Sequence, residues 1–156
     1  MHLNNSFKIY NASAGSGKTF NLVKEYLILL LTSGNDDAYK NILAITFTNK
    51  AVNEMKSRIV ERLIEFSDKE KINKNSAIIK EIIKETKLSV NTINIKSDQI
   101  LKHLLKNYAA FEISTIDKFT QRIVRSFSYE LNIDSKYEVE IDEEDLLSKA
   151  VDKLIA

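Results

Sequence analysis

Hydrophobic residues along the chain alternate between short continuous runs and helical spacings. Residues 7–10 form a short run with strand-forming side chains, and residues 18–31 form an apolar stretch of helical length that Ser33, Gly34 and Asn35 close. Residues 41–47 form a second, nearly continuous apolar run, which is typical of a parallel strand covered on both faces. The pattern predicts an α/β fold in which helical crossovers connect parallel strands.

From residue 49 onward the apolar positions are three or four residues apart, so they define one face of a helix. We expect that face to pack on the sheet, and it consists of Val52, Met55, Ile59, Leu63 and Phe66. Residues 67–75 are polar and turn-like, whereas residues 78–87 and 97–108 again have helical spacing. We therefore predict a helical insertion over residues 67–108.

The alternation of strand and helix returns after the insertion. Residues 110–116 predict a third strand, and the inner face of the next helix is expected to consist of Ile116, Phe119, Ile123, Phe127 and Leu131. Residues 137–141 alternate apolar with acidic side chains, which predicts a half-exposed strand. Residues 143–156 have helical spacing that stops without a cap.

These patterns divide the chain into four parts. Residues 1–66 hold the first two strand-helix units, residues 67–108 the helical insertion, and residues 109–131 the third strand-helix unit. Residues 132–156 form an acidic strand-helix segment that we expect to be truncated.

Composition limits the class of protein. Of 156 residues, 44% are hydrophobic and 29% are charged, which is the balance of a soluble globular domain. The chain has no cysteine, which excludes disulfides and thiolate metal sites. A secretory signal is not recognisable, and the apolar run at residues 27–31 is far shorter than the roughly 18 residues of a membrane span. We expect a soluble cytoplasmic protein in a reducing compartment, with no membrane partner.

The net charge of +1 is unevenly distributed. Residues 1–130 carry 20 Lys and Arg against 14 Asp and Glu, whereas residues 131–156 carry 3 against 8. A mildly basic body with an acidic tail permits a polyanionic partner.

The stretch NASAGSGKTF at residues 11–20 carries the clearest candidate chemistry. A glycine-rich turn between a strand and a helix directs several backbone N–H groups at one anion, and the helix amino terminus adds positive potential. Ala12 replaces the first glycine of the phosphate-loop pattern, but the end of the pattern is intact. The residues expected to bind a nucleotide are Ser13, Ala14, Gly15, Ser16, Gly17, Lys18 and Thr19.

Two of these residues have specific expected roles. Lys18 can reach the β and γ phosphates, and the Thr19 hydroxyl can bind Mg²⁺. The alternative is a chance Gly-Lys-Thr sequence at the start of a helix.

Residues 46–51 lie at the end of the second predicted strand, where open parallel sheets place ligand contacts. Their hydroxyls, amide, lysine and backbone N–H groups can grip phosphodiesters, and Phe47 can stack on an exposed base. An ordinary helix start explains the segment equally well, with Thr48 or Asn49 as the N-cap and Phe47 in the core.

Three stretches in this order resemble the first motifs of UvrD/Rep-type superfamily 1 DNA helicases, and more closely those of RecB and AddA helicase-nuclease subunits. They are NASAGSGKTF, ILAITFTNKAVNEMKSRI and FEISTIDKFTQRIVRSF. Alanine at the position of Ala12 is common in that family. The resemblance implies a P-loop NTPase (RecA-like) fold with ATP and Mg²⁺ as cofactors. It also implies binding of single-stranded DNA by Thr46, Phe47, Thr48, Asn49, Lys50, Thr115 and Phe119.

The chain departs from the family in its third motif, where Asp117 replaces a histidine, and we expect Asp117 to cap the following helix. The glutamine that reads adenine in many relatives is missing from the residues before Ala12.

Hydrolysis also needs an acidic residue after a buried strand and an arginine that neutralises transition-state charge. The acidic cluster at residues 142–145 follows an alternating segment, so we do not assign it this role. The candidate arginines lie on helices with apolar stripes, where solvation or contact with a DNA backbone is expected, and they are Arg58, Arg62, Arg122 and Arg125.

The leading hypothesis is therefore an incomplete motor domain, the amino-terminal part of a RecB/AddA-like DNA helicase of repair or recombination. Its expected partners are single-stranded DNA, the remaining helicase domains and a second helicase-nuclease subunit. Alone it is expected to bind nucleotide at most moderately and to hydrolyse it hardly at all. Two alternatives stay open: a non-catalytic nucleotide-binding module, and a small-molecule kinase, although residues 67–108 lack the arginines of a kinase lid.

Overall fold

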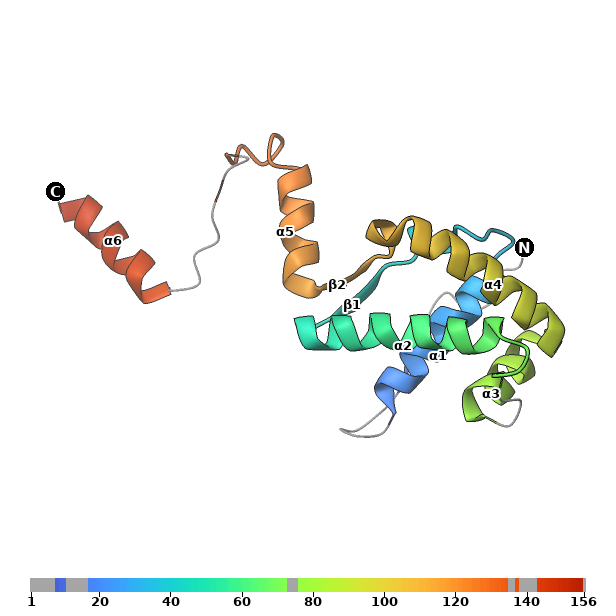
Figure 1. Ribbon diagram of the computed structural model, residues 1–156. Coiled ribbons are helices and arrows are strands. Elements are labelled where there is room, and N and C mark those ends of the chain that lie inside the picture. The colour runs from blue at the N-terminus through green and yellow to red at the C-terminus, as the bar shows by residue number, and fades with distance from the viewer. Residues whose placement is uncertain (1–7, 11–16, 73–75, 135–136, 138–142, 156) are drawn as a thin grey trace. The chain divides into compact units, whose positions relative to one another are not determined.

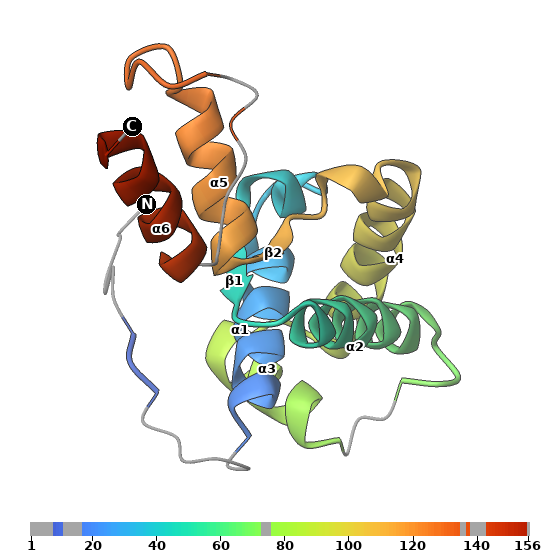
Figure 2. The same ribbon diagram turned by 90° about the vertical axis from the view of Figure 1, so that its left-hand side faces the viewer.

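The computed structural model describes residues 8–10, 17–72, 76–134, 137 and 143–155 (Figure 1). The chain divides into two compact units, Met1–Asp117 and Lys118–Ala156, and each is described by itself. Most of the described secondary structure belongs to the first unit, which Figure 2 shows from a second side.

The first unit contains four α-helices, two short 3₁₀ helices and a two-stranded parallel sheet in its described residues. In chain order these elements are α1 (Lys18–Thr32), η1 (Ala38–Asn41), β1 (Ala44–Thr46), α2 (Asn49–Ser67), α3 (Ala77–Thr86), α4 (Val90–Lys106), η2 (Tyr108–Ala110) and β2 (Ile113–Thr115). The strands pair in the register Ala44 to Ile113, Ile45 to Ser114 and Thr46 to Thr115. The prediction of a parallel sheet is thus confirmed for β1 and β2.

Both strands are shorter than predicted. The strand predicted over 41–47 is reduced to its centre, because Asn41 ends a 3₁₀ helix and residues 42, 43 and 47 carry no strand. Ile116 begins a helix directly after β2, which shortens the strand predicted over 110–116.

The strand predicted over residues 7–10 is wrong for the three residues that the structure describes, since residues 8–10 carry no strand. Ile9 is 78% exposed, so its side chain does not supply the burial that stabilises a strand. Lys8 and Tyr10 instead bind the Glu25 carboxylate of α1 through their side chains. Phe7 lies outside the described residues.

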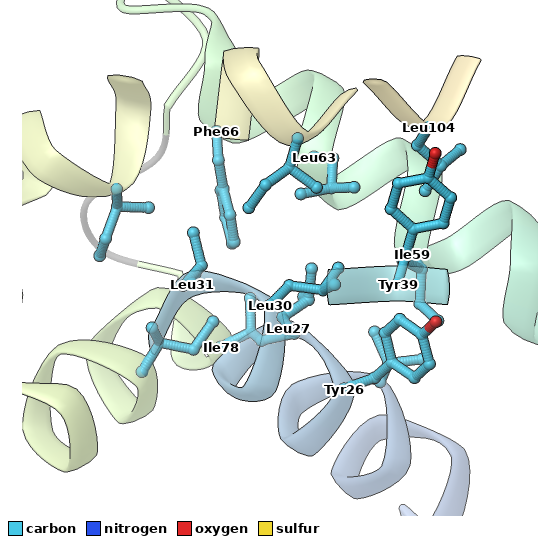
Figure 3. Packing of buried hydrophobic residues seen from close by; sticks show 14 of the residues in the cluster. Tyr26, Leu27, Leu30, Leu31, Tyr39, Ile59, Leu63, Phe66, Ile78 and Leu104 are labelled. Carbon is cyan, nitrogen blue, oxygen red and sulfur yellow. The ribbon is translucent and has the colours of Figure 1, made fainter. Parts of the chain in front are cut away.

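The core of the first unit lies between the helices (Figure 3). Leu27, Leu30 and Leu31 of α1 face Leu63 and Phe66 of α2, and all five are fully buried. Burial of one such side chain contributes about 1.5–3 kcal/mol. The apolar face predicted for α2 is therefore confirmed, with Met55 and Ile59 also buried and Val52 packed at the edge of the core.

The predicted helical insertion consists of α3 and α4, and it shares this core. Ile79 and Ile82 of α3 are fully buried, and Asn94 Nδ2 of α4 donates a hydrogen bond of 2.9 Å to the Phe66 carbonyl oxygen. α4 begins seven residues before its predicted start, because Ser89 Oγ accepts a hydrogen bond of 3.1 Å from the Thr92 N–H and caps the helix there.

The second unit contains most of α5 (Ile116–Ser126) and all of α6 (Glu143–Ile155). α5 ends at Ser126, so Phe127 and Leu131 of the predicted inner face lie beyond it. Both of these residues are exposed, as are Ile116 and Ile123 within the helix. Spacing specifies which side chains share a face and not what covers that face, so this expectation of burial is wrong. Of the strand predicted over 137–141 only Tyr137 is described, and it carries no strand.

None of the helices in the described ranges is both long and apolar enough to cross a membrane.

Candidate functional site

The candidate phosphate site lies at the start of α1. Ser13, Ala14, Gly15 and Ser16 lie outside the described residues, so the structure places only the end of the predicted loop. Gly17 is the N-cap of α1 and has a left-handed φ of 83°, which strains any residue with a side chain. A Cβ at this position would meet nothing within 4 Å, so backbone conformation and not lack of space favours glycine here.

The first turn of α1 has the electrostatic character of an anion site. Within the described part of the chain, no side chain caps this turn, and the turn contains no acidic residue. The early N–H groups of a helix lack intrahelical acceptors and carry partial positive charge. Lys18, which is exposed, adds a full positive charge at the same end.

A hollow of about 270 Å³ at this helix start is lined by Gly17, Lys18, Thr19, Phe20 and Arg58. Arg58 comes from α2, so the hollow brings together residues forty positions apart in the sequence. Glu54 Oε1 lies 2.6 Å from Arg58 Nη2 and holds the guanidinium. A glycine turn, a helix start and two cations around one hollow fit a phosphate group.

Arg58 is not among the residues that the sequence predicts for the phosphate site. One signal was present: Arg58 lies between Met55 and Ile59, at the border of the buried face of α2. A residue at such a border can reach the start of a neighbouring helix, but the spacing alone does not name that helix.

A second hollow, of about 140 Å³, shares Phe20 and Arg58 with the first and is also lined by Val23, Glu61, Arg62 and Ile78. An aromatic ring and a guanidinium therefore lie at the junction of two hollows.

Residues just before the loop are attached to α1 by an ionic cluster. Tyr10 OH donates a hydrogen bond of 2.6 Å to Glu25 Oε1, and Lys8 Nζ lies 3.0 Å from Glu25 Oε2. Burial raises the pKa of Glu25, but hydrogen bonds from Tyr10 and Lys8 outweigh it and hold this pKa below its usual value. The Glu25 carboxylate therefore stays charged and joins Lys8 and Tyr10, which precede the loop, to α1, which follows it.

Lys24 extends this cluster to α3. Burial lowers the pKa of Lys24, but the hydrogen bond and charge of Glu85 outweigh this effect. The pKa of Lys24 is therefore above its usual value. Lys24 therefore remains a cation although its side chain is only 6% exposed.

The second candidate segment lies between β1 and α2. Thr48 is the N-cap of α2, and its Oγ1 accepts a hydrogen bond of 3.1 Å from the Ala51 N–H. The helix-start interpretation is thus confirmed for Thr48, whereas Asn49 is the first residue of the helix and not its cap. Phe47 is 84% exposed, so the alternative that placed Phe47 in the core is wrong.

Two threonines, Thr46 and Thr115, lie side by side at the ends of the two strands. Thr46 and Thr115 are register partners in the parallel sheet, and Thr46 Oγ1 donates a hydrogen bond of 3.2 Å to the Thr48 carbonyl oxygen. Thr115 is buried, with 5% of its surface exposed. Lys50 is exposed in the first turn of α2.

The predicted site residues after β2 lie on α5. Asp117 is in the first turn of α5, where its charge complements the helix dipole, but it is not the residue that precedes the helix. Phe119 is half-buried and belongs to the second unit.

Across the described residues, no group of three or more His, Asp or Glu side chains could hold a metal ion. Thr19, which lines the first hollow, is the residue whose hydroxyl the sequence predicts as a metal contact.

The whole chain, residues 1–156, matches the family described as the UvrD/REP helicase N-terminal domain. The chain belongs to this family. Membership in the UvrD/REP family confirms the predicted P-loop NTPase-like fold class. The described residues form a helix-rich part of such a fold, with a two-stranded parallel sheet.

Curated relatives support membership in the UvrD/REP family. The chain is 32% identical over 135 residues to an ATP-dependent helicase/nuclease subunit of Lactobacillus johnsonii, and the match covers 86% of the chain and 9% of that protein. It is 30% identical to the RecBCD enzyme subunit RecB of Haemophilus influenzae, covering 92% of the chain and 12% of that protein. A 52-residue match to RecB of Chlamydia muridarum is 52% identical and covers 33% of the chain and 5% of that protein.

The chain thus spans about a tenth of the length of the first two relatives. No solved structure matches the chain significantly.

Proposed function

We propose that this chain is the amino-terminal ATP-binding and single-stranded-DNA-contacting part of an ATP-dependent DNA helicase. The observation that carries the proposal is the hollow at the start of α1, where left-handed Gly17, Lys18, Thr19 and Arg58 converge. Membership in the UvrD/REP family supports this interpretation of the hollow. The kinase alternative is not favoured, since α3 and α4 pack into the core and residues 67–108 contain no arginine for a lid.

In this proposal the α1 hollow binds the phosphates of ATP. Backbone N–H groups at the start of α1 face the phosphates, and Lys18 and Arg58 neutralise their charge. Residues 13–16, which lie outside the described residues, are expected from the sequence to add further N–H groups. Thr19 supplies a hydroxyl to Mg²⁺, which neutralises charge on the β and γ phosphates when it is bound. Phe20, at the junction with the second hollow, offers a ring on which a base can stack.

The segment after β1 is proposed to bind single-stranded DNA. Phe47 is the best-placed side chain for stacking on a base, because most of its surface is exposed, and such stacking contributes about 1–3 kcal/mol per base. Lys50, and the backbone N–H groups of Thr48 and Asn49 at the start of α2, are suited to phosphates. Thr115 is buried, so we assign it to positioning the strand end beside Thr46, while Phe119 is proposed as a second apolar contact.

For the whole protein we propose ATP-driven movement along one DNA strand, with duplex separation as the result. The remaining helicase domains would supply the acidic residue and the arginine that hydrolysis requires. A second helicase-nuclease subunit is a further proposed partner, suggested by the RecBCD name of the Haemophilus influenzae relative.

Strand displacement by the protein that carries this chain tests the proposal. We expect unwinding to require ATP and Mg²⁺ and to be lost in Lys18→Ala, whereas Lys80→Ala, at an exposed position of α3, leaves it unchanged. Unwinding that survives Lys18→Ala, or that needs no nucleotide, contradicts the proposal.

A further inference from the structure

Six side chains form one cluster beside α1, which we call the Lys24 cluster. It joins α1 to the insertion helix α3 and to the residues that precede the phosphate loop. Its members are Lys8, Tyr10, Lys24, Glu25, Glu81 and Glu85. None of these six described residues lines the hollow at the start of α1, so any effect of the cluster on a bound nucleotide is indirect.

Tyr10 is held by two neighbouring residues of α1. Its hydroxyl donates a hydrogen bond of 2.6 Å to Glu25 Oε1, and Lys24 Nζ lies 5.7 Å from the centre of its ring, which is a cation–π distance. Lys8 Nζ donates a further hydrogen bond of 3.0 Å to Glu25 Oε2. The chain that enters the loop is therefore fixed to the middle of α1.

The insertion helix holds the Lys24 ammonium in this position. Glu81 and Glu85 are four positions apart and so lie on one side of α3. Lys24 Nζ lies 3.4 Å from Glu81 Oε2 and 2.5 Å from Glu85 Oε1. Glu85 Oε2 also lies 3.8 Å from Lys8 Nζ. The insertion thus supports the residues before the loop through both lysines.

The phosphate loop is short, and the residues at its two ends are attached to the same helix. Residues 11–16 connect Tyr10 to Gly17, which is the N-cap of α1, and Glu25 follows Gly17 by about two helical turns. Phosphate binding by such a loop requires several N–H groups to converge on one anion. Fixing both ends of a short segment reduces the conformational freedom that it loses on binding. The contacts of Tyr10 therefore lower the entropic cost of binding a phosphate.

We propose that Glu25 and Lys24 are positioning residues of the nucleotide site, which act through Tyr10 on the start of the phosphate loop and raise its affinity for ATP. The inference rests on the proposed function and deepens it, because it gives the insertion helix α3 a part in nucleotide binding. A cluster that only stabilised the fold would change the free energy of unfolding and leave the affinity for ATP unchanged.

Isothermal titration calorimetry of the full chain with ATP and Mg²⁺ tests the proposal. Tyr10→Phe removes one hydroxyl and keeps the ring beside Lys24. Loss of one such hydrogen bond should weaken ATP binding by about two- to tenfold. Inorganic triphosphate with Mg²⁺ should show the same fold-change, because the anchor acts on the phosphate loop. Circular dichroism verifies that each variant is folded at the temperature of the titration.

Tyr108→Phe is the matched control. Tyr108 and Tyr10 are each 44% exposed, so both substitutions remove one hydroxyl from an equally accessible ring, but Tyr108 lies in η2, outside the Lys24 cluster. We expect Tyr108→Phe to bind ATP as the wild type does. Wild-type affinity in Tyr10→Phe overturns the proposal, and so does an equal loss in Tyr108→Phe.

Glu25→Ala tests the route from α1 to the loop, because it removes the acceptor of the Tyr10 hydroxyl. It should weaken ATP binding at least as much as Tyr10→Phe does. Adding Tyr10→Phe to Glu25→Ala should have no further effect, since the contact is already lost. Additive losses would contradict the assignment of Tyr10 to Glu25.

Lys18→Ala separates this inference from the proposed function. If Lys18→Ala abolishes ATP binding and Tyr10→Phe leaves it unchanged, the proposed nucleotide site stands and the positioning role fails. If both substitutions weaken binding, both are supported. If the wild type binds neither ATP nor triphosphate, the nucleotide site fails, and the positioning role fails with it.

Discussion

Lys24 Nζ lies 2.5 Å from Glu85 Oε1, and this contact joins the helix that follows the phosphate loop to a helix of the insertion. The same ammonium lies 3.5 Å from Glu25 and 3.4 Å from Glu81, so three carboxylates share one buried cation. The insertion is thereby fixed to α1 by charge as well as by the core. Lys8 and Tyr10 bind the same cluster, which connects it to the residues before the loop.

Lys24→Met should destabilise the first unit, because it removes the cation that neutralises three carboxylates. We expect the free energy of unfolding to fall by about 1–3 kcal/mol, the range for a buried polar group that loses its partner. Lys80→Met, at an exposed position of α3, should change it by less than about 0.5 kcal/mol. Urea denaturation measures both, and equal effects of the two substitutions would count against a special role of the cluster.

The pH dependence of stability should include Glu25. Because its folded pKa lies below the ordinary value of 4.5, Glu25 contributes stability that is present above that pH and is lost as the pH falls below it. Glu25→Gln should therefore flatten the loss of stability below pH 4.5, whereas Glu70→Gln, at an exposed position, should not. Urea midpoints measured across this range provide the check, and an unchanged slope in Glu25→Gln excludes the assigned contribution.

Thr48→Ala should weaken the start of α2, since the N–H of Ala51 then loses its side-chain acceptor. The expected loss is about 1 kcal/mol of unfolding free energy, and Thr48→Ser should restore most of it because serine is an equally good cap. Thermal unfolding of the three proteins gives the comparison. If Thr48→Ala is as stable as the wild type, the capping hydrogen bond is not a source of stability.

The features that the sequence could predict are those specified by periodicity. The three-and-four spacing of Met55, Ile59, Leu63 and Phe66 identifies the buried face of α2, because a helix places such residues on one side. Strand lengths were less predictable, since an apolar run does not specify how many of its residues pair with a neighbouring strand, and only Ala44–Thr46 do so.

Tertiary contacts explain what the sequence could not predict. Arg58 joins the hollow at Gly17 only because α2 lies beside α1, and the Lys24 cluster joins residues sixty-one positions apart. The exposed face of α5 has the same origin, since spacing predicts that Ile116 and Ile123 share a side but not what covers them. The roles of residues 13–16 remain predictions, because these residues lie outside the described ranges.

Arg58→Gln should weaken binding of ATP with Mg²⁺, because a charged contact at the edge of the hollow is lost. A hydrogen bond to a charged group contributes about 1.5–3 kcal/mol, so we expect a loss of at least about tenfold in affinity. Lys80→Gln is the matched control, since it also removes one exposed cation but Lys80 lines neither hollow. Titration calorimetry that finds equal affinities for Arg58→Gln and the wild type would exclude a phosphate contact by Arg58.

The most direct test of the nucleotide site is the thermal stability of this chain with and without ATP and Mg²⁺. A ligand at 100 times its Kd stabilises the folded state by about 2.7 kcal/mol, so the wild type should melt at a higher temperature with nucleotide. Lys50→Ala, which alters the proposed DNA contact, should keep this shift, and Lys18→Ala should lose it. Equal shifts in the wild type and Lys18→Ala would contradict the account.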